Sequence, residues 1–133
     1  MGFFLHEFIP LELTSRYPKD WRGDISAAEK DIVFIPDDQF SIEVKTSSNP
    51  TRIFGNRSYA QKSITSKKGK SGYYIAVNFE KFLTPSKRPE IVLIRFGWLD
   101  SSDWIGQTAS TGQQARLPSD VEKYKLLTIY RKT

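Results

Sequence analysis

Alternating hydrophobic and polar residues divide the chain into short strands separated by turns. Strict alternation from Phe40 to Thr46 predicts a strand with one apolar face, because successive side chains in a strand point to opposite faces. The β-branched run from Asp31 to Ile35 predicts a second strand, and the intervening Pro36-Asp37-Asp38-Gln39 is typical of a turn. The two strands are therefore expected to form a hairpin.

Three more apolar runs predict further strands, because they are rich in β-branched and aromatic residues. They span Tyr73 to Phe79, Glu90 to Trp98 and Tyr124 to Tyr130. Helical signals are weaker. Either a helix or an extended arm is expected over residues 3–13, and a loop over residues 14–24, where Pro18 and Gly23 interrupt any regular pattern.

Elsewhere one helical turn is expected at Ser26–Lys30, and short helices are expected at Tyr59–Thr65 and Gln113–Leu117. The predicted fold class is therefore α/β (α+β), with a mixed central sheet of about five strands and few short helices. No internal repeat or shift of composition marks a boundary, so residues 1–133 are expected to form a single domain.

Composition narrows the function classes. Hydrophobic residues make up 38% of the chain, enough for an ordinary core, but no apolar run approaches the roughly 20 residues that cross a bilayer. The N-terminus does not resemble a signal peptide, so a cytoplasmic location is expected. The absence of cysteine excludes thiol chemistry, and the lone His6, expected at the surface or at an interface, argues against His-rich metal sites. Enzyme chemistry would have to use carboxylates, lysines and hydroxyls.

Positive charge is concentrated in the middle of the chain, although the net charge is only +5. Between Val44 and Phe79 there is no Asp or Glu. The cations of this stretch are Lys45, Arg52, Arg57, Lys62, Lys67, Lys68 and Lys70. A field of one sign attracts polyanions such as nucleic acid. The alternative is a solvated basic loop that has no partner.

The predicted hairpin brings three polar side chains together. Glu43 and Lys45 are two residues apart in one strand and share a face, while their apolar neighbours take the other. Asp31 opens the preceding strand and joins this face if it lies opposite Glu43 or Lys45. A two-residue turn would put Asp31 opposite Val44, so a loop of three or five residues, or a bulge, is expected.

These residue types suit phosphodiester hydrolysis. Two neighbouring carboxylates stay ionised together most easily with a divalent cation between them, and oxygen ligands favour Mg²⁺ or Mn²⁺. The Val44 carbonyl can complete the shell. A bound ion activates water, and a neighbouring lysine stabilises charge that builds on phosphorus. The same residues also occur by chance, because surface strands often pair Glu with Lys.

Two stretches carry a resemblance to a known family. The run Asp31-Ile-Val-Phe-Ile, a turn, and then Ser41-Ile-Glu-Val-Lys-Thr-Ser resembles the metal-binding hairpin of the PD-(D/E)xK nuclease superfamily. Glu43-Val-Lys-Thr-Ser-Ser-Asn, followed by Ile53-Phe-Gly-Asn-Arg-Ser-Tyr59, further resembles type II restriction endonucleases of the ScaI kind.

The resemblance implies a role for each hairpin residue. Asp31 matches the first metal-binding acid, Glu43 the second, and Lys45 the catalytic lysine. It also implies a restriction-endonuclease-like fold, a Mg²⁺-dependent deoxyribonuclease acting on double-stranded DNA, and a homodimer that matches palindromic DNA. Residues 1–133 would then be a single nuclease domain of minimal or trimmed form.

Some assignments stay open at this point. Alternatives for the first acid are Asp24, Asp37 and Asp38. Many relatives in the superfamily have a further acid on a helix before the hairpin, for which the candidates are Glu7, Glu12 and Glu29. A structure-specific or repair nuclease, and a non-enzymatic basic module that binds nucleic acid, are the competing functions.

Candidate DNA contacts follow the hairpin. Asn56 and Arg57 can read adenine and guanine edges, or Arg57 can contact phosphate. Lys62, Lys67, Lys68 and Lys70 are candidates for phosphate contact. Gln113, Gln114 and Arg116 are either further DNA contacts or the polar face of a surface helix.

Overall fold

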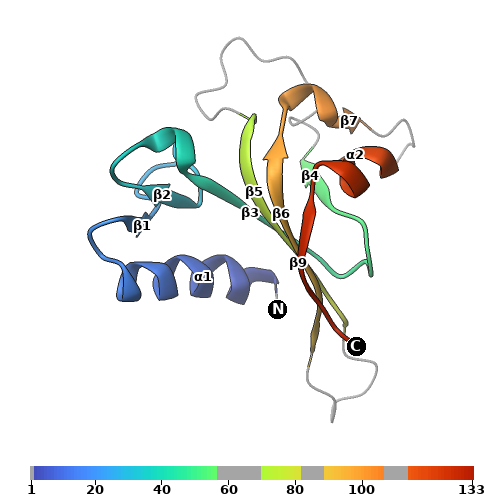
Figure 1. Ribbon diagram of the computed structural model, residues 1–133, viewed down its shortest axis with the longest axis horizontal. Helices are drawn as coiled ribbons and strands as arrows, with labels where there is room; N and C mark the ends of the chain where they lie inside the picture. Colours follow the sequence, from blue (N-terminus) through green and yellow to red (C-terminus); the bar gives the residue numbers. More distant parts are fainter. Residues whose placement is uncertain (1, 57–69, 82–88, 107–113) are drawn as a thin grey trace.

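The computed structural model describes residues 2–56, 70–81, 89–106 and 114–133, and these form two sheets and two α-helices (Figure 1). The helical elements are α1 (Gly2–Arg16), α2 (Ser119–Tyr124), and the 3-10 turns η1 (Asp38–Phe40) and η3 (Ser101–Asp103). The strands are β1 (Trp21–Gly23), β2 (Ile32–Phe34), β3 (Ile42–Ser47), β4 (Phe54–Asn56), β5 (Gly72–Phe79), β6 (Ile91–Leu99), β7 (Ile105–Gly106), β8 (Gln114–Arg116) and β9 (Leu127–Arg131).

The central sheet has six strands in the order β1-β2-β3-β5-β6-β9. Strands β3 and β5 run parallel, and the other neighbours are antiparallel. The predicted mixed sheet is therefore confirmed. The additional strand is β1, which lies where a loop was expected and was missed because Gly23 ends it. The backbone of β1 pairs with that of β2, where Trp21 lies opposite Phe34. This pairing supplies the backbone hydrogen bonds of β1, which its own sequence does not predict.

A smaller antiparallel sheet, in the order β4-β8-β7, packs with α2 against one face of the central sheet. The core between them contains Ile53, Tyr74, Ala76, Leu99, Trp104, Ala115, Leu117 and Leu126, with Val121 of α2 packed on it. The helix expected over Gln113–Leu117 is wrong. Residues 114–116 form β8, because β4 and β7 bond its backbone from both sides.

Two other helix predictions met different outcomes. Ser26–Lys30 is a turn and not a helical turn, because the Glu29 carboxylate accepts the Ile25 backbone N–H at 2.8 Å and so bonds its own loop. Tyr59–Thr65 lies outside the described residues. The segment that could have been a helix or an arm is the helix α1, which buries Leu5 and Pro10.

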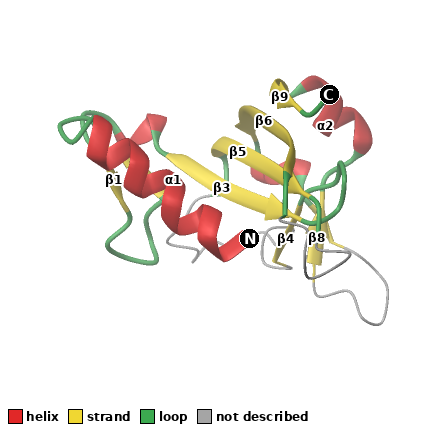
Figure 2. Cartoon of the chain, turned by 90° about the horizontal axis from the view of Figure 1, so that it is seen from below, coloured by secondary structure: helices red, strands yellow, loops and turns green. Residues whose placement is uncertain are grey.

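Helix α1 lies along β1 and β3 on the side of the sheet seen in Figure 2, and its N-terminal end approaches β4 and β8. This brings the first residues of the chain to the end of the β2–β3 hairpin. Within the described part of the chain, no helix is long and apolar enough to cross a membrane.

Candidate active site

The β2–β3 hairpin has the register that brings its acids together. Ile32 lies opposite Ile42, and the same antiparallel register places Asp31 opposite Glu43. The loop is longer than expected, since residues 35–41 join the strands. The side chain of Asp37 accepts the Gln39 N–H at 3.0 Å and caps η1, so the longer loop satisfies its own polar groups.

Asp31 is held at the end of β2 by the backbone of the neighbouring strand. Strand β2 begins only at Ile32, so the Val44 N–H has no strand partner on that side and donates to Asp31 Oδ2 at 2.8 Å. The N–H and C=O of one strand residue point toward the same neighbour. The Val44 carbonyl therefore faces the side on which the Asp31 carboxylate lies.

Glu43 is the buried member of the pair, with 2% of its surface exposed. Tyr74 of β5 lies beside it in the parallel register. Burial raises the pKa of the Tyr74 hydroxyl, and the negative charges of Glu43 and then Asp31 raise it further. Both carboxylates therefore lie within electrostatic range of the same hydroxyl group.

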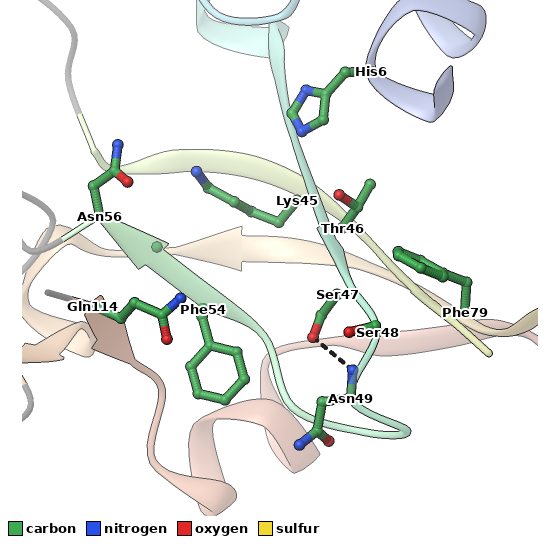
Figure 3. Close-up of a pocket in the computed structure, with 11 residues that line it drawn as sticks. His6, Lys45, Thr46, Ser47, Ser48, Asn49, Phe54, Asn56, Phe79 and Gln114 are labelled. Carbon is green, nitrogen blue, oxygen red and sulfur yellow. Dashed lines mark hydrogen bonds between the residues drawn. The ribbon is translucent and has the colours of Figure 1, made fainter. Parts of the chain in front are cut away.

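Lys45 lies on the same face of β3 as Glu43, and its side chain lines a cleft of about 530 Å³ (Figure 3). The described lining of this cleft contains no carboxylate. It consists of His6, Lys45, Thr46, Ser47, Ser48, Asn49, Phe54, Gly55, Asn56, Phe79 and Gln114. An ammonium group in a cleft without carboxylates attracts a phosphate.

His6 of α1 is the residue that sequence reasoning missed. Its Nδ1 lies 3.7 Å from Asp31 Oδ2, and its side chain is 36% exposed on the cleft wall. A lone histidine in a helix carries no spacing signal. Only the packing of α1 against β3 brings it to the hairpin.

The other candidate acids lie elsewhere. Asp37 and Asp38 are in the exposed hairpin loop, where Asp38 accepts a hydrogen bond from the Ser41 hydroxyl at 2.8 Å. Asp24 is exposed in the loop that follows β1. Their positions favour Asp31 as the first acid.

None of the three candidate helper acids is placed at the hairpin by the contacts of the described residues. Glu12 pairs with Arg16 on the surface of α1, and Glu7 is exposed on the same helix. Glu29 is bonded through both carboxylate oxygens to Arg22, and this hydrogen bonding lowers its pKa to about 2. The α1 side chain beside Asp31 is that of His6.

The hairpin suits a hard divalent cation. Among the described residues no group of three or more acidic or histidine side chains gathers around one point. The oxygens of Asp31 and Glu43 and the Val44 carbonyl nevertheless form an all-oxygen donor set. Mg²⁺ is usually held by one or two carboxylates and keeps several waters, so this set fits it.

Of the candidate DNA contacts, four are described: Asn56, Lys70, Gln114 and Arg116, the last of which pairs with Phe54 of β4 and Ile105 of β7. Asn56 ends β4 on the cleft wall, and Lys70 precedes β5, where its carbonyl accepts the Tyr74 hydroxyl at 2.5 Å. The others, Arg57, Lys62, Lys67, Lys68 and Gln113, lie outside the described residues. Gln114 lies opposite Asn56 in the β4–β8 pair.

A mixed sheet whose hairpin presents two acids and a lysine beside a cleft defines the restriction-endonuclease-like class. The chain belongs to the ScaI restriction endonuclease family, which it matches over residues 1–130. It is 51% identical over 132 residues to a Streptomyces caespitosus protein described as "Type II restriction enzyme ScaI". That match covers 98% of this chain and 58% of the relative, so the chain spans little more than half of that protein's length. No solved structure gives a significant match.

Proposed function

We propose that this chain is a type II site-specific restriction endonuclease that hydrolyses phosphodiester bonds of double-stranded DNA with Mg²⁺, Mn²⁺ being a substitute. The observation that carries the proposal is the hairpin register, which sets Asp31 opposite Glu43 with Lys45 on the same face at the cleft. Family membership supports it, as does the description of the Streptomyces relative as a type II restriction enzyme.

Each hairpin group has a role in this proposal. Asp31, Glu43 and the Val44 carbonyl would hold Mg²⁺, and the bound ion would supply Lewis-acid polarisation of the scissile phosphate and a water of lowered pKa. Lys45 donates hydrogen bonds to the attacking water and to a phosphate oxygen, and it stabilises the added negative charge as the bond to the leaving sugar oxygen breaks. The buried position of Glu43 strengthens these interactions, because water screens them less.

The acid-free stretch from Val44 to Phe79 supplies the DNA contacts. We assign them to Asn56, Arg57, Lys62, Lys67, Lys68 and Lys70. Two copies of the chain related by a two-fold axis would match a palindromic site, so we propose a homodimer acting in the cytoplasm.

The test is digestion of plasmid and phage DNA by the full chain with MgCl₂, with EDTA, and with Lys45→Ala. Discrete bands that need Mg²⁺ and fall by about 100- to 1,000-fold in rate with Lys45→Ala are expected. Lys19→Ala, at an exposed lysine before β1, is the matched control and should cut normally.

The other outcomes separate the competing functions. A smear with the same Mg²⁺ and Lys45 dependence would replace site-specific cleavage by a structure-specific, repair or non-specific nuclease. Retention of DNA that weakens with salt, without cleavage in Mg²⁺ or Mn²⁺, would overturn the nuclease proposal in favour of a basic binding module.

A further inference from the structure

The cleft has a second wall that the catalytic hairpin does not supply. Strands β4 and β8 form a short antiparallel ribbon, and Asn56 and Gln114 lie opposite each other in it. Both line the cleft that Lys45 enters (Figure 3). Two side chains 58 positions apart in the sequence are thus paired on one surface.

Strand alternation fixes the direction of these amides. Gly55 and Ala115 lie opposite each other between the amide pair and the next pair, and Ala115 is fully buried in the core. Asn56 and Gln114 must then project from the other face of the ribbon, and both are exposed. The amide groups therefore face the cleft and not the protein interior.

The neighbouring amide of Asn49 shows the contrast between a structural and an available group. Its Oδ1 accepts the backbone N–H groups of Thr51 (3.0 Å) and Arg52 (2.9 Å), so it holds its own loop. Within the described residues, the amides of Asn56 and Gln114 make no hydrogen bond. Each keeps a donor and an acceptor for a ligand.

This chemistry fits one kind of base edge. A two-stranded ribbon fits the major groove, where adenine offers an acceptor at N7 and a donor at N6. A side-chain amide offers the complementary donor and acceptor and bonds both at once. Lys45 enters the same cleft, so the base that is read lies at or next to the phosphate that is cut.

We propose that Asn56 and Gln114 together read an A·T base pair from the major groove beside the scissile phosphate. The inference rests on the proposed function, and it adds Gln114, the identity of the base and its place relative to the cut. A phosphate-contacting role for the same residues would affect all sequences alike.

The experiment exposes the full chain, with MgCl₂, to a DNA library whose central eight base pairs are randomised, and sequences the cut ends. The parent should require A·T at a position next to the cut. Asn56→Ala and Gln114→Ala should each reduce that preference by about 5- to 150-fold and leave the preference at other positions intact. Gln39→Ala, at an exposed amide on η1 outside the cleft, is the matched control and should change nothing.

A second pair of variants tests the hydrogen bonds themselves. Asn56→Asp and Gln114→Glu keep the side-chain shape but only accept hydrogen bonds, and carboxylates favour the amino group of cytosine. The preference should move from A toward C at the same position. An adenine that lacks N7 should weaken cutting by the parent and cause no further loss with the alanine variants. Uniform loss across all sequences, or unchanged selectivity, would overturn the inference.

Failure of the proposed function would be recognised separately. If the parent does not cut any library member, the same library is enriched for bound DNA with Ca²⁺ in place of Mg²⁺. A·T enrichment that depends on Asn56 and Gln114 would then support base reading without cleavage. Binding without that enrichment, or no binding by folded protein, would contradict it.

Discussion

Two polar clusters share one face of the central sheet, and they differ in what surrounds their charges. Lys45 of β3 and Arg95 of β6 both lie beside Ala76 of β5, so a single strand separates the clusters. The cluster around Lys45 borders the open cleft. The cluster around Arg95 is sealed in the interior, with Arg95 and Glu122 both buried.

The buried cluster, which we call the clamp, consists of Arg52, Asn78, Arg95 and Glu122. Arg52 Nε lies 2.9 Å from one oxygen of Glu122, and Arg95 Nη2 lies 3.4 Å from the other. Arg95 also donates to the Thr51 carbonyl at 2.5 Å. Burial raises the pKa of Glu122 and lowers that of Arg95, so their attraction offsets a desolvation cost.

The difference teaches what each cluster is for. The clamp also binds the backbone. Asn78 donates hydrogen bonds to the carbonyls of Asn49 (2.8 Å) and Arg52 (3.1 Å), and these two bonds hold the loop that leads from β3 to β4. The clamp therefore holds the chain between β3 and β4 in its folded position. Asn49 on the cleft wall holds the same loop, whereas Lys45 and Asn56 line the open cleft, so we expect these two residues to matter for cleavage and the clamp for folding.

The largest expected effect is loss of cleavage with Asp31→Asn. The substitution keeps an oxygen that can accept the Val44 N–H but removes the charge that would hold Mg²⁺, so the rate should fall on the order of 1,000-fold. Asp37→Asn retains its cap on η1 and should cut normally. Cleavage rates at saturating Mg²⁺ measure both, and equal losses would show that Asp31 has no special role.

A substitution in the clamp should lower the stability of the folded protein. Glu122→Gln leaves two buried or half-buried arginines without their counter-charge, and the free energy of unfolding should fall by about 3 kcal/mol. Urea denaturation measures this, with Glu80→Gln at an exposed glutamate as control. Cleavage per folded molecule should persist. An unchanged unfolding free energy would contradict the assignment of the clamp to folding and of the cleft to cleavage.

The opposite stability effect is expected in the cleft. Glu43→Gln removes a buried negative charge that lies opposite a second carboxylate, so it should stabilise the protein by about 1 kcal/mol while abolishing cleavage. Thermal unfolding in EDTA is the measurement. A clear loss of stability would mean that Glu43 serves the fold as Glu122 does.

The smallest effect concerns the Arg22–Glu29 pair, which bonds the loop before Asp31. Hydrogen bonding from Arg22 lowers the Glu29 pKa from 4.5 to about 2. A lowered folded-state pKa stabilises the protein above pH 4.5, and this contribution disappears as the pH falls through about 2. The difference in unfolding free energy between the parent and Glu29→Gln should disappear as the pH falls from 4.5 to about 2. A difference that is independent of pH would contradict it, and Glu12→Gln on α1 is the control.

The hairpin was predictable because two physical signals agreed in it. Strict alternation gave the faces of Glu43 and Lys45, and the core requirement selected the register that includes Asp31. The loop length was wrong because η1 depends on side-chain caps that a count of turn residues does not reveal.

The parts that sequence patterns missed depend on distant partners. Strands β4, β7 and β8 have only two or three residues each, too few for a periodic pattern, and they exist because they bond one another. Helix α2 was missed too, since Tyr124 was assigned to the last strand but ends this helix instead. His6 and Gln114 reach the cleft only through such tertiary packing.

The pairing of β4 with β8 also bears on how the protein is made. Strand β4 has no partner until residues 114–116 have been synthesised, 58 positions after Asn56. At about 5 to 20 residues per second, that interval is roughly 3 to 12 seconds. Small domains fold cooperatively, so a nascent chain that ends before β8 lacks both the finished core and the Asn56–Gln114 pair. Under the proposed function, a growing copy would acquire its DNA-reading wall only after these residues have been synthesised.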